Sequence, residues 1–158
     1  VSGESDYFRY GGTASKALEI LKELTVKLET EKEQEGKRHM VLLDDLGTAF
    51  EPGNEELANL MNTFAPMVSS RQDVHLMAAG LVDELRMRTA SPIIQTLRQS
   101  RTGLVFSKDS GEVDWLGAQI PLEFRRIELP AGRGFYVSKG KPTLVQIPYF
   151  GKCSKKPD

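Results

Sequence analysis

The stretch Arg38-His39-Met40-Val41-Leu42-Leu43-Asp44-Asp45 decides the fold of this chain. Four apolar residues, from Met40 to Leu43, run directly into two adjacent carboxylates. A short, continuous apolar run of this kind predicts a strand that is buried on both faces of a parallel sheet. The carboxyl edge of such a sheet is where α/β proteins bind ligands. Asp44 and Asp45 are therefore candidate ligand-binding residues, and the alternative is that they only cap a loop.

The composition excludes several classes of protein. With 39% hydrophobic and 27% charged residues among 158, the chain has the composition of one ordinary globular domain. A net charge of −1 argues against a protein whose main task is to bind nucleic acid, so no nucleic acid is expected as a partner. The single cysteine, Cys153, favours a reducing compartment. No apolar run approaches the roughly 20 residues that span a bilayer, so we expect no direct membrane contact in this fragment.

Helical and strand patterns alternate over the first two thirds of the chain. Apolar residues recur every three or four positions after Thr13, a residue suited to cap a helix. A second helix is expected after Asn54, and Pro66 should end or kink it early. Strand-like runs follow at residues 74–80 and 103–106, and a hairpin is predicted over residues 134–147. The pattern predicts a mainly parallel α/β sheet flanked by helices, with an antiparallel C-terminal hairpin.

The order of these landmarks resembles that of FtsK/SpoIIIE-type ATPases. Residues 39–45 are similar to the Walker B region of that family, and residues 70–80 resemble the segment that ends in its polar Ala-Thr-Gln sensor. Residues 114–117 and 130–137 resemble elements of the ATPase modules of the type VII secretion motor, EccC or EssC. The resemblance implies a RecA-like (P-loop NTPase) fold, with one module over residues 1–150 and a flexible tail over residues 151–158.

The same resemblance implies roles for three residues. Asp44 would bind Mg²⁺ and, through it, ATP. Asp45 takes the place of the family's catalytic Glu, which orients the attacking water. Arg101 could reach the nucleotide of a neighbouring module as an arginine finger, and the alternative is an ordinary surface arginine. His75 is expected to be structural, because no second ligand lies at metal spacing from it.

Three departures from the family predict a degenerate module. The sequence contains no Gly-x-x-x-x-Gly-Lys-Ser/Thr loop, either because the fragment begins downstream of it or because the loop is absent. Asp45 is one methylene shorter than Glu, and a displacement of about 1 Å can cost about a hundredfold in rate. Ala78-Ala79-Gly80 replaces the polar sensor and offers no side-chain hydrogen bond to a γ-phosphate.

The expected function is therefore that of a degenerate ATPase module in the cytoplasmic portion of a membrane-anchored type VII secretion coupling protein. Its expected partners are helical-hairpin secretion substrates of the Esx type and neighbouring ATPase modules of the same chain. The apolar residues at positions 81, 82, 85 and 87 could form a groove for a helix, or belong to the core. A fragment whose sheet lacks a central strand would expose open edges, so a homo-oligomer is also expected.

Two alternatives stay open. The chain could be a competent ATP-hydrolysing motor module whose P-loop lies outside this fragment, in which case Asp44 and Asp45 would serve catalysis directly. It could also be a fragment of a DNA translocase. The near-neutral charge argues against the translocase, because tracking along a phosphate backbone needs a basic channel.

Overall fold

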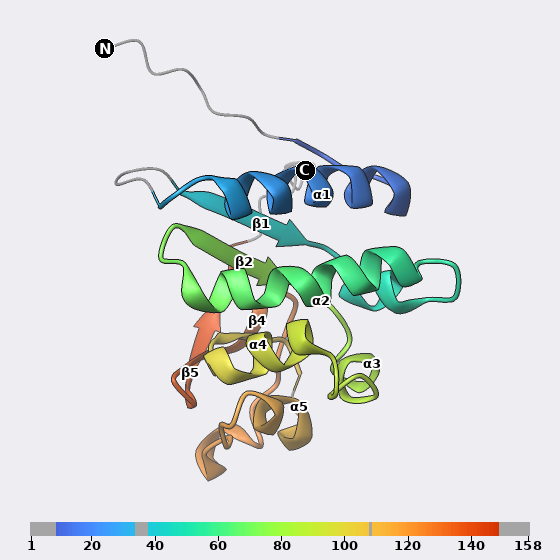
Figure 1. The fold of residues 1–158 in the computed structure, drawn as a ribbon. Helices are drawn as coiled ribbons and strands as arrows, with labels where there is room; N and C mark the ends of the chain where they lie inside the picture. The colour runs from blue at the N-terminus through green and yellow to red at the C-terminus, as the bar shows by residue number, and fades with distance from the viewer. Residues whose placement is uncertain (1–8, 34–37, 108, 149–158) are drawn as a thin grey trace, which may run out of the picture. The chain divides into compact units, whose positions relative to one another are not determined.

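The computed structural model describes residues 9–33, 38–107 and 109–148. The first half contains two long helices and a pair of strands (Figure 1), with bounds α1 (Ala14–Thr30), β1 (His39–Leu43), the 3₁₀ helix η1 (Leu46–Phe50), α2 (Glu55–Ser70), β2 (Val74–Ala78) and α3 (Val82–Arg86). The second half contains short helices and three strands, with bounds α4 (Pro92–Ser100), β3 (Gly103–Val105), α5 (Ser110–Trp115), the 3₁₀ helix η2 (Leu122–Phe124), β4 (Arg133–Ser138) and β5 (Lys141–Gln146).

The strands form two sheets, which confirms the predicted α/β class. β1 and β2 pair in parallel, with His39 opposite Val74 and Leu43 opposite Ala78. β3, β4 and β5 form an antiparallel sheet in that order, and β4 and β5 are the predicted C-terminal hairpin. The chain divides into two compact units, one ending at Leu97 and one beginning at Arg98. We call these the N-terminal and C-terminal units; the prediction of one module over residues 1–150 stays a prediction.

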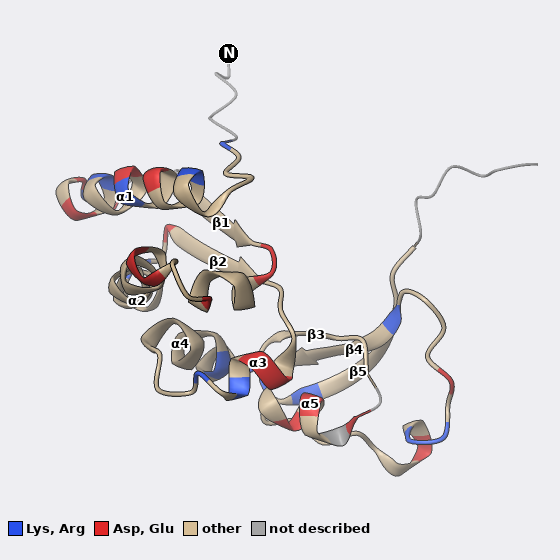
Figure 2. Ribbon diagram, turned by 90° about the vertical axis from the view of Figure 1, so that its right-hand side faces the viewer, with Lys and Arg blue, Asp and Glu red and all other residues tan. Residues whose placement is uncertain are grey.

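In the N-terminal unit, α1 and α2 lie against the same face of the β1–β2 pair (Figures 1 and 2). The side chain of Thr13 accepts a hydrogen bond from the Lys16 amide at 3.4 Å, which confirms the predicted cap of α1. The predicted apolar stripes supply much of the core, whose buried members include Leu21, Leu28, Leu57, Met61, Phe64, Ile93 and Ile94. Hydrophobic burial along these stripes therefore stabilises the unit.

Two expectations for this unit are wrong. β1 is partly buried on one face and exposed on the other, since His39, Val41 and Leu43 are half-buried, whereas Met40 is 64% exposed and Leu42 is 62% exposed. Among the described residues, both long helices lie on the face of the sheet opposite to Met40 and Leu42. A continuous apolar run in the sequence does not reveal whether one face or both faces of a strand will be covered. α2 also does not end at Pro66 but continues to Ser70, because tertiary burial of its apolar stripe outweighs the hydrogen bond that proline cannot make. The alternative expectation, a kink at Pro66, stays a prediction.

A buried ion pair joins the connection between α2 and β2 to the end of α1. Arg71 donates from Nε and Nη2 to the two carboxylate oxygens of Asp73, at 2.9 and 2.8 Å. Its Nη1 donates to the carbonyl oxygens of Leu28 and Glu31, at 2.6 and 2.8 Å. The Asp73 carbonyl also accepts the His39 amide at 2.7 Å, where β1 begins. One residue pair thus fixes α1, β1 and β2 relative to one another.

The C-terminal unit has its own core under the antiparallel sheet. Seven buried residues form it: Val105, Val113, Leu116, Ala118, Ile120, Phe135 and Val137. Arg101, directly after α4, adopts a left-handed backbone with φ of 50°. Its Nη2 donates to the Gly117 carbonyl at 2.8 Å, and its own carbonyl accepts the Gly140 amide at 3.1 Å. Arg101 therefore ties the residues after α5 and the β4–β5 turn to the start of β3.

Some expectations fall outside the described residues. These are the flexible tail at residues 151–158 and Cys153 within it. Across the ranges that the structure does describe, none of the helices combines the length and the apolar character that crossing a membrane requires.

The Arg71–Asp73 pair predicts a pH-dependent stability. Arg71 holds the pKa of Asp73 below its ordinary value, chiefly by hydrogen bonding to the carboxylate. The stabilisation is therefore complete above the unfolded pKa of about 3.9 and is lost as the pH falls through the lower folded pKa. Asp73→Asn should lower the Tm at pH 7, and its difference from the wild type should narrow only below about pH 4 in thermal unfolding.

A matched control for this experiment is Asp83→Asn, which removes a carboxylate that also pairs with an arginine, Arg86, but lies at the surface. An exposed pair contributes little to stability, so its Tm should stay close to that of the wild type at every pH. An unchanged Tm for Asp73→Asn at pH 7 would contradict a structural role for the buried pair.

The contacts of Arg101 predict a role in the stability of the C-terminal unit. Arg101→Ala removes the hydrogen bond to Gly117 and keeps a side chain at a positive φ, so we expect a loss of about 1 kcal/mol in unfolding free energy. Arg101→Gly loses the same bond but relieves the backbone strain, and should be less destabilising than Arg101→Ala. Chemical denaturation measures both, with Arg98→Ala as the control; equal stability of all four proteins would exclude this role.

Candidate functional site

The carboxyl ends of β1 and β2 meet at one edge of the parallel pair. β1 ends at Leu43, so Asp44 and Asp45 lie directly beyond this edge, where the sequence placed them. The Leu43 carbonyl accepts the Ala79 amide at 2.8 Å, and the Ala79 carbonyl accepts the Leu46 amide at 2.8 Å. These bonds hold the loop after β1 against the loop after β2. Ala78-Ala79-Gly80, the expected sensor position, therefore contributes backbone bonds that fix the edge.

Asp45 has a local structural role at this edge. Its backbone is left-handed, with φ of 53° and ψ of 61°, a conformation that Asp tolerates better than most residues. Its Oδ2 accepts a hydrogen bond from the Thr48 hydroxyl at 2.9 Å, and its carbonyl accepts the Thr48 amide at 3.1 Å. The Asp45 carbonyl thus begins η1, and the Asp45 side chain bonds to a side chain within that turn. Asp44, directly before it, is exposed.

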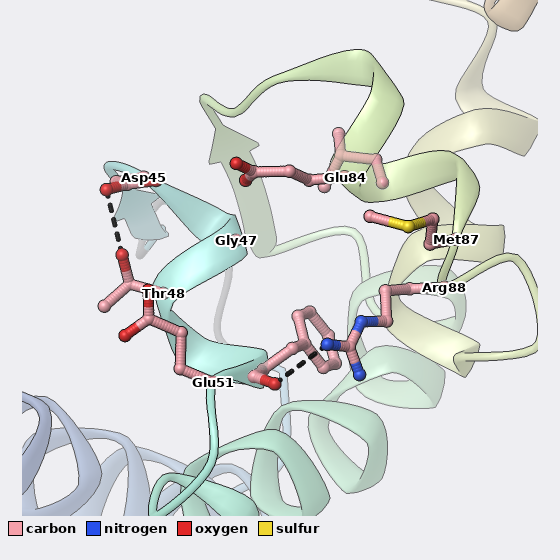
Figure 3. Close-up of a pocket in the computed structure, with 9 residues that line it drawn as sticks. Asp45, Gly47, Thr48, Glu51, Glu84, Met87 and Arg88 are labelled. Atoms are coloured by element: carbon pink, nitrogen blue, oxygen red, sulfur yellow. Dashed lines mark hydrogen bonds between the residues drawn. The ribbon is translucent and has the colours of Figure 1, made fainter.

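A cavity of about 210 Å³ opens beside this loop (Figure 3). η1 and its flanks form one wall, and α3 with the turn after it forms the other. Glu84 and Asp45 both border its upper part, and Arg88 crosses its lower part. Nine residues line the cavity: Asp45, Gly47, Thr48, Phe50, Glu51, Glu84, Leu85, Met87 and Arg88.

The cavity is acidic. Three of its lining residues carry carboxylates (Asp45, Glu51 and Glu84), and its single cationic residue is Arg88. Arg88 Nη2 donates to the Phe50 carbonyl at 3.0 Å, and its guanidinium carbon lies 5.5 Å from the centre of the Phe50 ring. The one positive charge is therefore already engaged by a carbonyl and by an aromatic face. Such a site favours a cation or a basic group over an anion.

These residues do not fit a nucleoside triphosphate. A phosphate site needs converging amide donors or free cations, and this edge presents carboxylates instead. Within the described part of the chain, no cluster of three or more His, Cys, Asp or Glu side chains could hold a metal ion. The role of Asp44 as a Mg²⁺ ligand and that of Asp45 as a catalytic residue stay predictions.

Arg101 does not line this cavity. It belongs to the C-terminal unit, where its guanidinium bonds to the Gly117 carbonyl. Sequence analysis missed Glu84, Thr48 and Arg88 as members of the site, because they come from a stretch that read as a loop and from a short helix of mixed composition. The one available signal was Asp-x-x-Thr at residues 45–48, a spacing that brings two polar side chains together across one helical turn.

Comparison with known proteins gives structural neighbours only. No protein-family model matches the chain. No curated protein matches it either. The cytoplasmic domain of the Thermomonospora curvata type VII secretion ATPase EccC matches with a TM-score of 0.67 and 18% identity, over 96% of this chain and 19% of that one. The cytoplasmic domain of EssC matches with a TM-score of 0.67 and 18% identity, over 92% of this chain and 30% of that one.

A further structural neighbour is a peptide complex. EccC ATPases 2 and 3 from Thermomonospora curvata, in complex with a signal sequence peptide, match with a TM-score of 0.63 and 19% identity, over 90% of this chain and 27% of that one. The chain thus spans between 19% and 30% of the length of these neighbours. Identities this low establish a shared fold, and the fold that the sequence resemblance implied is confirmed. This chain has the fold of the EccC and EssC cytoplasmic ATPase domains.

Proposed function

We propose that this chain is a degenerate ATPase module of a type VII secretion coupling protein, and that it recognises export substrates or regulates neighbouring ATPase modules. The acidic cavity at the carboxyl edge of β1 and β2 carries this proposal. The Asp44-Asp45 pair takes the place of the family's Walker B carboxylates, and here Glu51 and Glu84 add two further carboxylates beside it, where the phosphates of ATP would lie. Like charges at short range would weaken nucleotide binding there.

The local bonding supports the same proposal. The Asp45 carboxylate accepts the Thr48 hydroxyl, so one of its oxygens is engaged in the protein's own turn. The residues that follow β2 are Ala79 and Gly80, which have no polar side chain to sense a γ-phosphate. The sequence given contains no phosphate-binding Gly-Lys-Ser/Thr loop. The Asp45 position and the sensor position are thus both poorly suited to hydrolysis in this chain.

The proposed partner is a helical export substrate. One neighbouring structure is described as a complex with a signal sequence peptide, and by analogy we assign peptide recognition to this module. Two of the four candidate groove residues fit a docking role, since Leu81 is 67% exposed and Met87 is 77% exposed. Leu85 is buried and belongs to the core. We place the module in the cytoplasmic portion of a membrane-anchored chain, as a part of a multi-module motor.

One observation favours the competent-ATPase alternative. Asp44 is exposed directly beyond the carboxyl end of β1, the position from which a Walker B carboxylate would hold Mg²⁺. This alternative requires a phosphate-binding loop from outside the sequence given. A competent ATPase completed by such a loop would bind Mg·ATP, whereas a degenerate module would not. Calorimetry on a chain that includes the upstream residues therefore separates the two hypotheses.

Titration with Mg·ATP of the chain extended upstream by about 100 residues, the scale of a half-domain, should give no binding heat at tens of micromolar protein, because the acidic edge lacks free cations. Asp44→Ala should give the same flat isotherm as the wild type. Asp83→Ala, which removes an exposed carboxylate on α3, serves as the control for nonspecific charge effects. Saturable binding to the wild type that Asp44→Ala abolishes would overturn the proposal in favour of the competent ATPase.

Docking through Leu81 and Met87 predicts a selective loss of substrate binding. The double variant Leu81→Asp/Met87→Asp should weaken the affinity for an Esx-type helical hairpin at least about tenfold, since apolar anchors carry most of such contacts. Its Tm should change little, because both side chains are exposed. Leu122→Asp is the control, since Leu122 is 75% exposed in the C-terminal unit. Equal affinities for the three proteins would contradict this docking surface.

A further inference from the structure

Arg101 lies between α4 and β3 and bonds to two segments of the C-terminal unit that are distant from it in the sequence. Its Nη2 donates to the Gly117 carbonyl at 2.8 Å, in the loop that follows α5. Its own carbonyl oxygen accepts the amide of Gly140 at 3.1 Å, in the turn between β4 and β5. One residue therefore joins three segments of this unit, by a bond from its side chain and a bond from its backbone.

The guanidinium of Arg101 lies in a slot that two glycines leave open. A Cβ atom at Gly117 would lie 2.9 Å from Arg101 Nε, and a Cβ atom at Gly140 would lie 2.8 Å from Arg101 Cζ. Contacts this short do not occur at real Cβ atoms, so a side chain at either position would collide with the guanidinium. The arginine thus occupies space that exists because both neighbours lack a side chain.

Both glycines also have a backbone that favours glycine. φ is 68° at Gly117 and 77° at Gly140, in the left-handed region. Lys139 and Gly140 are the two residues between the paired Ser138 and Lys141, and both have positive φ, as a tight hairpin turn requires. The turn alone therefore favours glycine at position 140, and a test of the slot has to separate the effect of φ from the effect of the guanidinium.

We propose that Arg101, Gly117 and Gly140 form a conformational lock. With the guanidinium in its slot, the loop after α5 and the β4–β5 turn are held against the start of β3. When the guanidinium leaves the slot, these two segments open while the core of the unit stays folded. The opening is local because none of the three residues belongs to the buried cluster of this unit. The inference is independent of the proposed function, since it concerns the C-terminal unit and not the acidic cavity.

The lock requires arginine and not just a positive charge. Arg101 Nη2, the atom that reaches the Gly117 carbonyl, lies one bond beyond Cζ, and Cζ is the position that corresponds to Nζ of a lysine. A lysine ammonium would therefore stop one bond short of that carbonyl. Lysine also lacks the rigid, planar fork that fixes the direction of the arginine donors.

This role differs from the arginine finger that the family resemblance implies. A finger extends its guanidinium to the nucleotide of a neighbouring module. To do so, Arg101 would first have to leave its slot and give up the bond to Gly117. The lock thus assigns the guanidinium a function inside its own unit.

A double-mutant cycle separates the slot from the backbone strain. Gly140→Ala in the wild type introduces a side chain at positive φ and displaces the guanidinium. In an Arg101→Ala background the lock is already lost, so only the strain and the contact with the Gly117 carbonyl oxygen remain. In chemical denaturation, Gly140→Ala should therefore raise the unfolding equilibrium constant at least about threefold less in the Arg101→Ala background than in the wild type.

Gly132→Ala is the matched control for this cycle. Gly132 also has a φ of 77° and lies in the same unit, but a Cβ atom there would meet the carbonyl oxygen of Ile147, at 2.8 Å. Its effect should be the same with and without the arginine side chain. An equal effect of Gly140→Ala in the two backgrounds would overturn the lock.

Amide hydrogen exchange tests whether the opening is local. Arg101→Lys keeps the charge but loses the lock, so exchange of the Gly140 amide should become about fivefold faster, the equivalent of about one hydrogen bond. The amides of Phe135 and Val137, in the central strand β4, should exchange as in the wild type. Arg98→Lys, the same change at an exposed arginine of α4, should leave the Gly140 amide unaffected. Unchanged exchange at Gly140 in Arg101→Lys, or an equal increase at Phe135 and Val137, would overturn the proposal.

Discussion

The parallel pairing of β1 with β2 is the constraint on which the N-terminal unit depends. Parallel strands cannot be joined by a short turn, so the chain must cross over through α2 before β2 can form. The Arg71–Asp73 pair sits at the end of that crossover and binds the carbonyls at the end of α1. The same pairing brings the loop after β1 against Ala79, and so it creates the edge where the acidic cavity lies.

The cavity shows that a chain can keep the backbone of a fold while the side chains at its site favour a different kind of ligand. The backbone places a loop with two aspartates where a nucleotide-binding protein would place its Walker B carboxylates. Yet the side chains around that loop satisfy one another: Thr48 bonds to Asp45, and Arg88 bonds to Phe50. Local charge, not backbone position, decides what a site can bind. The negative character of this edge is therefore more informative about function than its position in the sheet.

Sequence reasoning succeeded where periodicity and local chemistry act alone. The stripe of α1, its Thr13 cap and the β4–β5 hairpin follow from spacing and turn residues. It failed where distant segments meet, as when Arg88 bonds to Phe50, 38 residues away, or Arg71 to Leu28, 43 residues away. The prediction that β1 is buried on both faces was also wrong. An apolar run such as residues 40–43 shows that a strand can be buried, but it does not show whether one face or both faces will be covered.

The exposed face of β1, like the cavity, is a consequence of the parallel pairing of β1 with β2. A parallel pair is normally covered on both sides, so a pair with its long helices on one side leaves the apolar side chains of the other side exposed. The exposed apolar residues of this pair are Met40, Leu42 and Met77. The same strand, β1, ends directly before the loop that carries Asp45, a lining residue of the acidic cavity. One short strand therefore carries both an uncovered apolar face and the carboxyl edge at which the cavity lies.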